Sequence, residues 1–382
     1  MKILHVSPIT PSKGGYSRGH IDLCILLDKF GVKSAFVIPE TDDIEDYMRE
    51  MEIQFYGIAT SSLPGMGTIS FERGLRKKLK GIIEDFRPDI IISETVGLGP
   101  TVISIGQNFN RIRLLHWEKS PPTENSILGK LQTFHWYRTW KKFGMKTDAV
   151  MFQSKPHMEY TREITGVVPE ESIIMENGVD VDLFRGNEEI DRIPNKICYI
   201  GTVSKVRGIP DIIAAGEILH QEGVNFEINI FGSGNLKENC RKLAKTREWL
   251  VVHEFLEEDD LVRHLSESAI GVVPHPDLPA WRICSALKLR EYAAMGMMVV
   301  ARGLPVHTEF SEQRWMVIKE DGVGKTSLAE GIKAALSVSS ETRLEVSNEA
   351  RDFAERYFTY EYQTRVLIEW IMRETMQSEH NQ

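Results

Sequence analysis

The segment S-A-L-K-L-R-E-Y-A-A-M-G-M-M-V-V-A, Ser285 to Ala301, decides the fold because it predicts a helix that turns directly into a buried strand. Apolar residues recur on one side of this helix, at Leu287, Leu289, Tyr292, Ala293 and Met295. Gly296 supplies the left-handed position that ends many helices, and β-branched Val299 and Val300 favour a strand. A helix that runs straight into a buried strand is typical of an open α/β sheet.

Two charged residues of this helix, Lys288 and Glu291, are three positions apart and therefore lie near one helix face. The preceding segment, V-V-P-H-P-D-L-P-A-W-R-I-C, predicts a strand that runs into a loop, so Ser285, Ala286 and Leu287 begin the helix beyond the carboxyl end of a strand. Ligands bind at this edge of open α/β sheets, and helix N-terminal amides suit phosphate oxygens. The alternative is that Lys288 and Glu291 form a solvated ion pair.

Length and composition restrict the class of protein. A chain of 382 residues exceeds one ordinary hydrophobic core, which favours two domains. The net charge of −9 argues against a general nucleic-acid binder. No apolar run is long enough to span a membrane, and the start M-K-I-L-H-V-S is not typical of a signal peptide. The cysteines form no C-x-x-C pair, so we expect a reducing, cytoplasmic location: they are Cys24, Cys198, Cys240 and Cys284.

Short apolar strands alternate with amphipathic helices along the chain, which predicts parallel sheets covered on both faces. A polar segment, R-G-N-E-E-I-D-R-I-P-N, interrupts the series after residue 184 and is typical of a linker. We therefore expect an α/β fold with two Rossmann-like domains facing a cleft, over residues 1–186 and 195–358. A final helical pattern over residues 359–382, which carries Trp370, is expected to return to the first domain.

Glycines and cations follow predicted strands at three places. Gly14 and Gly15 come after the first strand, where glycine lets the backbone approach a ligand. In the second half, the segment G-T-V-S-K-V-R-G begins at Gly201 and carries the cations Lys205 and Arg207. An exposed backbone, a helix N-terminus and cations are what a diphosphate site requires. A further turn, F-G-S-G, follows the next strand and contains a third candidate glycine contact, at Gly232.

The order of these motifs resembles the GT-B glycosyltransferases of family 4, the glycosyl transferases group 1. The resemblance covers nearly the whole chain: the G-G turn, N-G-V-D-x-x-x-F from Asn177, G-T-V-S-K-V-R-G, F-G-S-G and S-A-L-K-L-R-E-Y-A-A-M-G. The last motif is the most specific, because it is similar to the Lys-x-x-Glu-Tyr-x-Ala-x-Gly pattern of that family. The N-G-V-D segment is the next most specific.

This resemblance implies a retaining transfer of a sugar from a nucleotide diphosphate sugar to an acceptor hydroxyl, without a protein-bound metal or another cofactor. The expected donor is a UDP- or GDP-sugar, bound by the second domain, and the acceptor is a glycan or a lipid-linked molecule, bound by the first. Glu291 would accept hydrogen bonds from the ribose hydroxyls. Arg207, with Lys205, would hold the diphosphate and stabilise it as leaving group, beside the backbone of Gly201, Thr202 and Gly208.

The resemblance also assigns two sites in the first domain. Gly14 and Gly15 would present amides to the diphosphate or the acceptor, and His116 matches a histidine near the transferred sugar. The alternative for His116 is a strand-end histidine that its neighbours satisfy. Two other functions stay open for the whole chain: a sugar-nucleotide epimerase of the same fold, and a non-catalytic descendant that binds a nucleotide or glycan.

The chain departs from the family pattern at two positions. Many members have a further glutamate eight residues before the ribose-binding one, where it contacts the donor sugar, and this chain has Ile283 there. Asp277, Arg282 or Ser285 would have to take over that contact. The family often has arginine where this chain has Thr202, which shifts the charge at the diphosphate towards Lys205.

Two further segments have alternative interpretations. G-V-G-K-T-S, residues 322–327, resembles part of a P-loop, but the full pattern requires glycine where Lys319 stands, so we expect Thr326 or Ser327 to cap a helix instead. The segments at 73–80 and 134–146 are basic. They form either solvated faces or a peripheral contact with the inner membrane face, with Trp136, Tyr137 and Trp140 at the interface.

Overall fold

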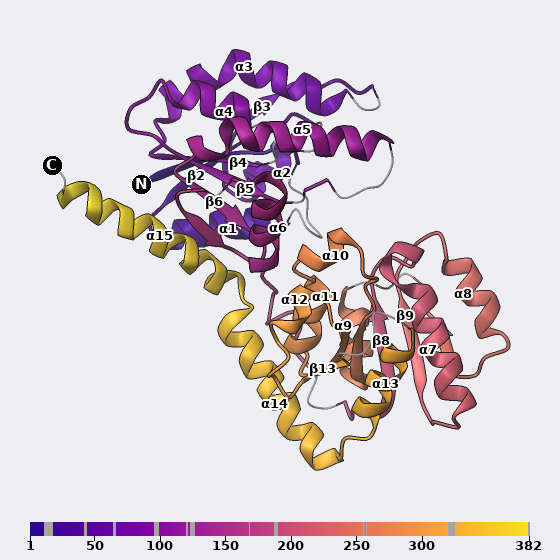
Figure 1. Cartoon of the computed structure of the whole chain (residues 1–382). Helices are drawn as coiled ribbons and strands as arrows, with labels where there is room; N and C mark the ends of the chain where they lie inside the picture. The colour runs from indigo at the N-terminus through magenta and orange to yellow at the C-terminus, as the bar shows by residue number, and fades with distance from the viewer. Residues whose placement is uncertain are drawn as a thin grey trace. The chain divides into compact units, whose positions relative to one another are not determined.

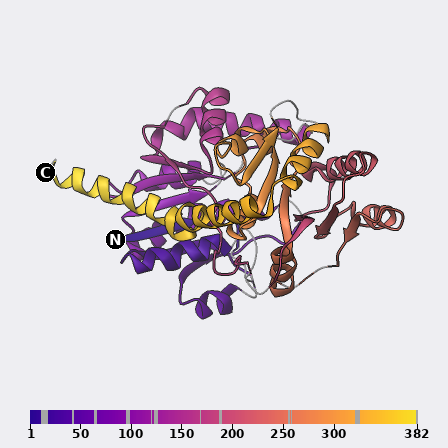
Figure 2. The same cartoon turned by 90° about the horizontal axis from the view of Figure 1, so that it is seen from below.

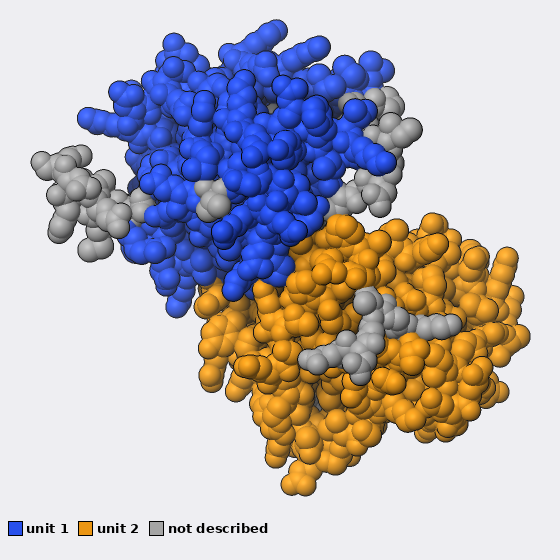
Figure 3. Space-filling view, viewed as in Figure 1, with its two compact units in different colours: residues 1–176, 363–382 blue, residues 177–362 orange. Residues whose placement is uncertain are grey.

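A computed structural model describes residues 1–10, 18–41, 44–63, 66–94, 99–119, 121–122, 127–167, 169–186, 190–254, 256, 258–319 and 325–380 (Figures 1 and 2). The chain divides into two compact units (Figure 3). Unit 1 consists of Met1–Glu176 with Gln363–Gln382, and unit 2 is Asn177–Tyr362. The predicted glycines 14 and 15 lie outside the described residues.

Unit 1 is built on a seven-stranded sheet in the order β3-β2-β1-β4-β5-β6-β7. All neighbouring strands are parallel. The strands are β1 (Lys2–Val6), β2 (Lys33–Pro39), β3 (Gln54–Ile58), β4 (Ile90–Glu94), β5 (Arg113–Glu118), β6 (Ala149–Phe152) and β7 (Ser172–Ile174). Four of the five residues of β1 are buried, as expected for a central strand covered on both faces.

Helices cover both faces of this sheet. They are α1 (Arg18–Lys29), α2 (Ile44–Glu50), α3 (Gly67–Phe86), α4 (Gly99–Gly106), α5 (Ile127–Phe143), η2 (Gly144–Lys146), α6 (Lys155–Thr165) and α15 (Tyr360–His380). The longest of those that precede α15 is α3, which buries six apolar residues against one face together with α4. On the other face α1 and α15 share one core.

The C-terminal helix α15 packs on the sheet of unit 1 (Figure 2). Leu367 and Trp370 are 0% and 1% exposed and lie in one cluster with Ile3 of β1. The guanidinium of Arg113 lies 4.3 Å from the centre of the Trp370 ring, and the indole N–H donates to Glu171. The expected return of the chain to the first domain is therefore confirmed.

Unit 2 contains a six-stranded parallel sheet in the order β10-β9-β8-β11-β12-β13. Its strands are β8 (Ile193–Ile200), β9 (Glu227–Phe231), β10 (Leu250–Val252), β11 (Ser268–Val273), β12 (Met298–Arg302) and β13 (Met316–Lys319). Its helices are η3 (Lys205–Arg207), α7 (Ile209–Gln221), α8 (Lys237–Ala244), α9 (Glu258–Glu267), α10 (Pro279–Ile283), α11 (Leu287–Ala294), α12 (Pro305–Thr308), α13 (Lys325–Leu336) and α14 (Ser340–Tyr357).

The predicted turn from helix to strand is present as α11, Gly296 and β12. Gly296 has a φ of +68°, in the left-handed region. Tyr292 ties α11 to the centre of the sheet, because its hydroxyl accepts a 2.9 Å hydrogen bond from the amide of Ile200. Its ring lies so close to β11 that a Cβ added at Gly271 would stand 2.3 Å from it. The fixed position of α11 therefore depends on one tyrosine and one strand glycine.

Three local predictions were wrong. The proline-containing loop before α11 includes a short helix, α10, and the polar linker includes the first residues of β8 from Ile193. Thr326 and Ser327 lie inside the first turn of α13, which begins at Lys325, and therefore do not precede it as caps. Among the described residues, no helix combines the length and apolarity that crossing a membrane requires. All four cysteines are free.

Candidate functional site

The candidate site lies at the carboxyl edge of the unit 2 sheet. The strand order reverses beside β8, because β9 lies on one side of it and β11 on the other. Open α/β sheets bind ligands at such a reversal. The loops that follow these strands carry most of the residues singled out from the sequence, so the fold brings them to one edge.

Glycines allow these loops to pack against one another. A Cβ added at Gly232, where φ is +143°, would stand 2.0 Å from the carbonyl oxygen of Gly201. A Cβ at Gly208, where φ is +84°, would stand 2.0 Å from the carbonyl oxygen of Pro274. Gly232 and Gly208 therefore allow close contacts between these loops, and their contact with a ligand stays a prediction. Gly201 itself is exposed, beside the ammonium group of Lys288.

Three cations gather at this edge and differ in burial. Lys205 is exposed, Arg207 is half-buried, and Lys288 is only 8% exposed. The guanidinium of Arg207 lies 4.4 Å from the centre of the Trp281 ring. Within the described part of the chain, no hydrogen bond or ion pair engages the side chain of Arg207. Its planar set of N–H donors is therefore available to an anion.

Lys288 and Glu291 form the centre of the site. Burial, with the nearby charge of Arg207, lowers the pKa of Lys288 to about 8. Burial raises the pKa of Glu291 to about 7, and the charge of Lys288 opposes this increase. The pair is therefore not the solvated ion pair of the alternative interpretation. No described residue donates a hydrogen bond to the carboxyl group of Glu291, which leaves both oxygens available as acceptors.

The start of α11 is held by the N-G-V-D segment. The side-chain amide of Asn177 donates a 2.9 Å hydrogen bond to the carbonyl oxygen of Ser285. The hydroxyl of Ser285 in turn accepts from Arg290 at 2.9 and 3.2 Å. Ala286 is the N-cap and offers no side-chain hydrogen bond, so no side chain caps the amides of the first turn, which begins at Leu287.

A buried apolar residue occupies the position at which many family members have a second glutamate. Ile283 is 5% exposed and packs as a core residue. Asp277 and Arg282 form an ion pair with each other at 2.9 Å, and Ser285 is already bonded as described. All three suggested replacements thus have partners. Thr202 is exposed, and its carbonyl oxygen accepts a 2.9 Å hydrogen bond from the Tyr199 hydroxyl.

His116 lies in unit 1, on β5, in a buried polar network. Its Nδ1 is 3.2 Å from the Ser93 hydroxyl and its Nε2 is 3.4 Å from a carboxylate oxygen of Glu118. The same oxygen accepts indole N–H groups from Trp136 at 3.3 Å and Trp140 at 3.0 Å. Both ring nitrogens of His116 therefore have protein partners, as the structural alternative for this residue requires. Glu118 is not among the residues that the motifs predicted.

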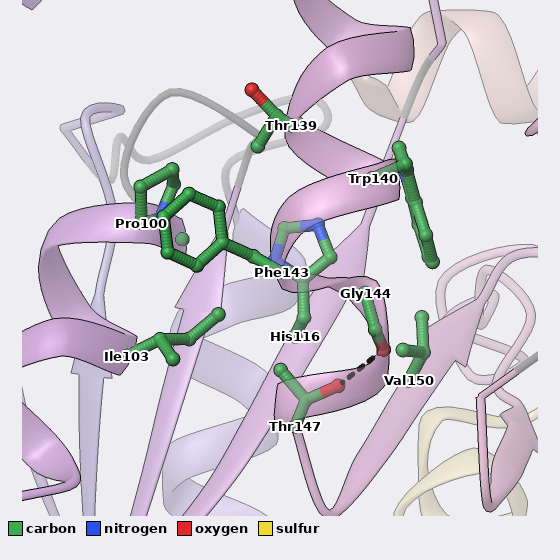
Figure 4. Close-up of a pocket in the computed structure, with 10 residues that line it drawn as sticks. Pro100, Ile103, His116, Thr139, Trp140, Phe143, Gly144, Thr147 and Val150 are labelled. Atoms are coloured by element: carbon green, nitrogen blue, oxygen red, sulfur yellow. Dashed lines mark hydrogen bonds between the residues drawn. The ribbon is translucent and has the colours of Figure 1, made fainter. Parts of the chain in front are cut away.

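A small apolar pocket adjoins the imidazole (Figure 4). It is lined by Gly99, Pro100, Ile103, His116, Thr139, Trp140, Phe143, Gly144, Thr147 and Val150. Figure 4 shows the imidazole between the rings of Phe143 and Trp140. The structure therefore places His116 under α4 and α5.

The expected membrane contact through Trp136 and Trp140 was wrong. Each is 3% exposed, and both pack in the core with Val150 and Phe152 of β6. Their indole N–H groups donate hydrogen bonds to Glu118 inside the unit, so these rings are not available to lipid. Tyr137 is 36% exposed.

No cluster of three or more His, Cys, Asp or Glu side chains that could hold a metal ion occurs among the residues that the structure describes.

Two Rossmann-like units, one with cations and a carboxylate at the carboxyl edge of its sheet, define the GT-B class of fold. Residues 194–337 match the family model of the glycosyl transferases group 1. The resemblance inferred from the motifs is confirmed. No curated protein sequence matches the chain.

Solved structures with the same fold cover 96% or more of the chain. Sucrose-phosphate synthase from Thermosynechococcus elongatus is 15% identical, covers 99% of both chains and has a TM-score of 0.72. HepE from Anabaena, solved in complex with UDP, is 14% identical, with a TM-score of 0.72 over 98% of this chain and 100% of its own. A glycosyltransferase from Rickettsia africae is 14% identical, with a TM-score of 0.74 over 96% and 97%.

Proposed function

We propose that this protein transfers a sugar from a nucleoside diphosphate sugar to an acceptor hydroxyl, with retention of the anomeric configuration and without a protein-bound metal. The observation that carries the proposal is the convergence of Arg207, Lys288 and Glu291 at the carboxyl edge of the unit 2 sheet. This arrangement offers cations to a diphosphate and a carboxylate to vicinal hydroxyls. The family match over residues 194–337 supports the same reaction class.

Each residue has a distinct role in this proposal. The carboxylate of Glu291 accepts hydrogen bonds from the two ribose hydroxyls, for which its two free oxygens suffice. Arg207, whose donors are unclaimed within the described part of the chain, binds the diphosphate with Lys205 and stabilises its charge as the bond to the sugar breaks. Lys288 adds a buried charge beside Gly201. The amides of Ser285, Ala286 and Leu287, at the N-terminal end of α11, complete the anion site.

UDP is the first nucleotide to test, because HepE was solved with UDP and with UDP-glucose. GDP is the second. The acceptor in this proposal is a glycan or a lipid-linked hydroxyl.

A thermal-shift panel tests the donor site. UDP, GDP, ADP and their sugar conjugates are compared, each with and without EDTA. A ligand at about 100 times its dissociation constant adds about 2.7 kcal/mol to the free energy of unfolding, which raises the melting temperature by a few degrees. We expect one nucleotide series to stabilise the protein with EDTA present. Glu291→Ala should abolish this shift, whereas Glu248→Ala, an exposed carboxylate of the same unit, should keep it.

A shift that requires a divalent metal would contradict the metal-free site. The reaction itself is followed by NMR of the anomeric proton of the sugar, first in the donor and then in the product of transfer. An α-configured donor should first give an α-configured product if the transfer is retaining. A 2-epimerised sugar nucleotide formed without an acceptor would instead identify an epimerase, and binding without any turnover would identify a non-catalytic binding protein.

We also propose that unit 1 docks on an anionic membrane through the outer face of α5, rather than through its buried tryptophans. Leu131 and Phe134 of α5 are 62% and 58% exposed, and Met145 of the adjoining η2 is 62% exposed. The segment from α5 through η2 has no acidic residue and carries five exposed cations: Lys130, Arg138, Lys141, Lys142 and Lys146. Basic residues next to exposed apolar side chains fit an anionic bilayer surface.

The basic segment 73–80 on α3 fits less well. Its Arg76 is paired with Glu72 at 2.6 Å, and Lys80 faces Glu84 at 3.8 Å. In contrast, none of the five α5 and η2 cations has a carboxylate partner within the described residues. We therefore assign the membrane contact to 134–146 with Leu131, and leave α3 outside it.

Vesicle sedimentation tests this contact at low salt. The protein should sediment with phosphatidylglycerol-containing vesicles and remain in solution with phosphatidylcholine alone. Lys141→Glu with Lys142→Glu should reduce the vesicle partition coefficient at least about 30-fold, since each basic residue near the surface contributes about 1 kcal/mol. Lys29→Glu with Lys33→Glu, an equal charge change elsewhere in unit 1, serves as the control. Equal sedimentation with neutral and anionic vesicles would contradict the proposal.

A further inference from the structure

Trp281 connects the cations of the unit 2 site to a group of stacked rings. Its ring centre lies 4.4 Å from the guanidinium carbon of Arg207. The ring of His275 lies 4.4 Å from the Trp281 ring, with an interplanar angle of 14°. His307 lies behind His275 at 6.0 Å. We call these three aromatic residues and Arg207 the Trp281 stack.

Trp281 also holds the backbone that carries Arg207. Its indole N–H donates a 2.7 Å hydrogen bond to the carbonyl oxygen of Val206, the residue before Arg207. Trp281 itself belongs to α10, which begins at Pro279 and ends at the buried Ile283. One side chain thus fixes both the guanidinium group and the turn of η3 from which that group extends.

The rings behind Trp281 are buried and rigidly placed. His275 and His307 are 1% and 0% exposed. The Nδ1 of His307 lies 2.8 Å from the carbonyl oxygen of Arg302, which fixes the orientation of its ring. The Nε2 of His275 lies 3.5 Å from the ammonium group of Lys288. Burial first, and then the charge of Lys288, lowers the pKa of His275 well below its usual value, so the ring that faces Lys288 is neutral.

The contact between Trp281 and Arg207 offsets a charge repulsion within this site. Arg207 and Lys288 carry like charges, and each disfavours the other before an anion binds. A long arginine side chain without a carboxylate partner would turn away into solvent. Stacking on a tryptophan face gives it an alternative attraction that leaves its N–H donors free, because the contact uses the face of the guanidinium group and the donors point along its edge.

We propose that Trp281 is a positioning residue that holds Arg207 in place for the phosphate groups of the nucleotide. This inference rests on the proposed function, because it assumes that Arg207 binds the diphosphate. It adds a residue outside the motifs that were singled out, on a helix that the sequence did not predict. Its consequence is specific: loss of Trp281 should weaken the recognition of a diphosphate and leave recognition of the nucleoside unchanged.

Calorimetric titration of the whole protein with UDP and UMP separates these effects, with GDP and GMP as a second pair. Wild type should bind the diphosphate at least about tenfold more tightly than the monophosphate, as a charge-assisted arginine contact to one phosphate predicts. Trp281→Leu should reduce this ratio to below about threefold and leave the affinity for the monophosphate within about twofold. Trp281→Phe, which keeps an aromatic face, should retain most of the ratio.

A double-mutant cycle shows whether Trp281 acts through Arg207. In an Arg207→Ala background, Trp281→Leu should change the affinity for the diphosphate by less than about twofold, because the group that it positions is gone. Lys242→Ala, which removes an exposed cation of α8 in the same unit, is the control and should leave the ratio unchanged. Trp281 is half-exposed, so its replacement leaves no core cavity.

The outcomes distinguish the two proposals. An unchanged ratio in Trp281→Leu, or an equal loss for UDP and UMP, overturns the positioning role and leaves the donor site intact. Additive effects in the double mutant also overturn it. If wild type binds neither pair of nucleotides, the donor site itself is contradicted, and the role of Trp281 falls with it.

Discussion

Two polar clusters, one around Glu118 in unit 1 and one around Glu291 in unit 2, differ in the hydrogen-bonding capacity that they leave unused. In unit 1, one oxygen of Glu118 accepts from Trp136 and Trp140 and lies within reach of His116. In unit 2, Arg207 and Glu291 have no hydrogen-bond partner among the described residues, although each is only partly exposed. Because a satisfied buried group stabilises a fold and an unsatisfied one costs free energy, the second cluster is the better candidate for binding.

The largest expected effect is a loss of stability when Glu118 is replaced. Glu118→Ala should reduce the free energy of unfolding of unit 1 by about 3–5 kcal/mol, because it leaves two indole N–H groups and a histidine without their acceptor in a dry core. Urea unfolding followed by tryptophan fluorescence measures this, since Trp136 and Trp140 report on the site. Glu118→Gln keeps one acceptor oxygen and should cost less. A loss below about 1 kcal/mol in Glu118→Ala would contradict the structural role.

Replacement of Arg207 should weaken nucleotide binding rather than the stability of the fold. Arg207→Ala should weaken the binding of the nucleoside diphosphate about 10- to 100-fold, since a charged hydrogen bond contributes about 1.5–3 kcal/mol. The unfolding free energy should change by less than about 0.5 kcal/mol, because the side chain has no internal partner among the described residues. Calorimetry and urea unfolding on the same sample measure both. A large loss of stability with unchanged affinity would show that Arg207 has a structural role and not a binding role.

Glu291 should show opposite effects on binding and stability. Its folded pKa of about 7 exceeds its normal 4.5, so its ionisation destabilises the fold at pH values above 7 and not below 4.5. Glu291→Gln should therefore raise the unfolding free energy by roughly 1–3 kcal/mol at pH 8, and have little effect at pH 4. The same variant should bind the nucleotide at least about tenfold more weakly. Melting curves at both pH values measure the difference, and equal shifts at both would contradict it.

The pH dependence of binding in wild type follows from the same group. Protonation of Glu291 removes an acceptor from the ribose site, so affinity should fall as the pH decreases through about 7. The loss should approach tenfold for each pH unit well below that value, because the carboxylate form becomes that much scarcer. Titrations from pH 5.5 to pH 8.5 measure it. The slope should disappear in Glu291→Gln, and a slope that persists there belongs to another group.

The smallest effect is expected at His116. His116→Gln can retain a contact with Ser93 or Glu118, so it should cost about 1 kcal/mol of stability and change the affinity for the nucleotide less than twofold. Urea unfolding and calorimetry measure these. A loss of turnover without a loss of affinity would instead support the contact with the transferred sugar that the family resemblance implies.

The elements closest to the opening segment could be predicted from the sequence because their signals are local. The apolar spacing of α11, the glycine after it and the valines of β12 each act over a few residues. The cluster around Glu118 could not be predicted, because its members are 18 and 22 residues apart in sequence and meet only in the folded sheet. Trp136 and Trp140 are four residues apart and therefore lie near one helix face, but spacing alone cannot show whether that face meets lipid or protein.

Prolines explain why α10 was missed. Three prolines in a short segment are typical of a loop, but Pro279 occupies the first turn of α10, where proline is well tolerated. The roles of Gly232 and Gly208 could be predicted only in part. Tight turns with positive φ angles could be expected at these glycines. The space beside them is filled by the carbonyl oxygens of Gly201 and Pro274, which belong to other loops and could not be predicted.

The course of α15 has a consequence for how the chain is made. Unit 1 begins with Met1, but its core also requires Leu367 and Trp370, near the other end of the sequence. During synthesis the ribosome has released all of unit 2 before these residues emerge, so unit 2 can finish folding while unit 1 is still waiting for its last helix. The half of the protein that is translated first is thus the half that is completed last.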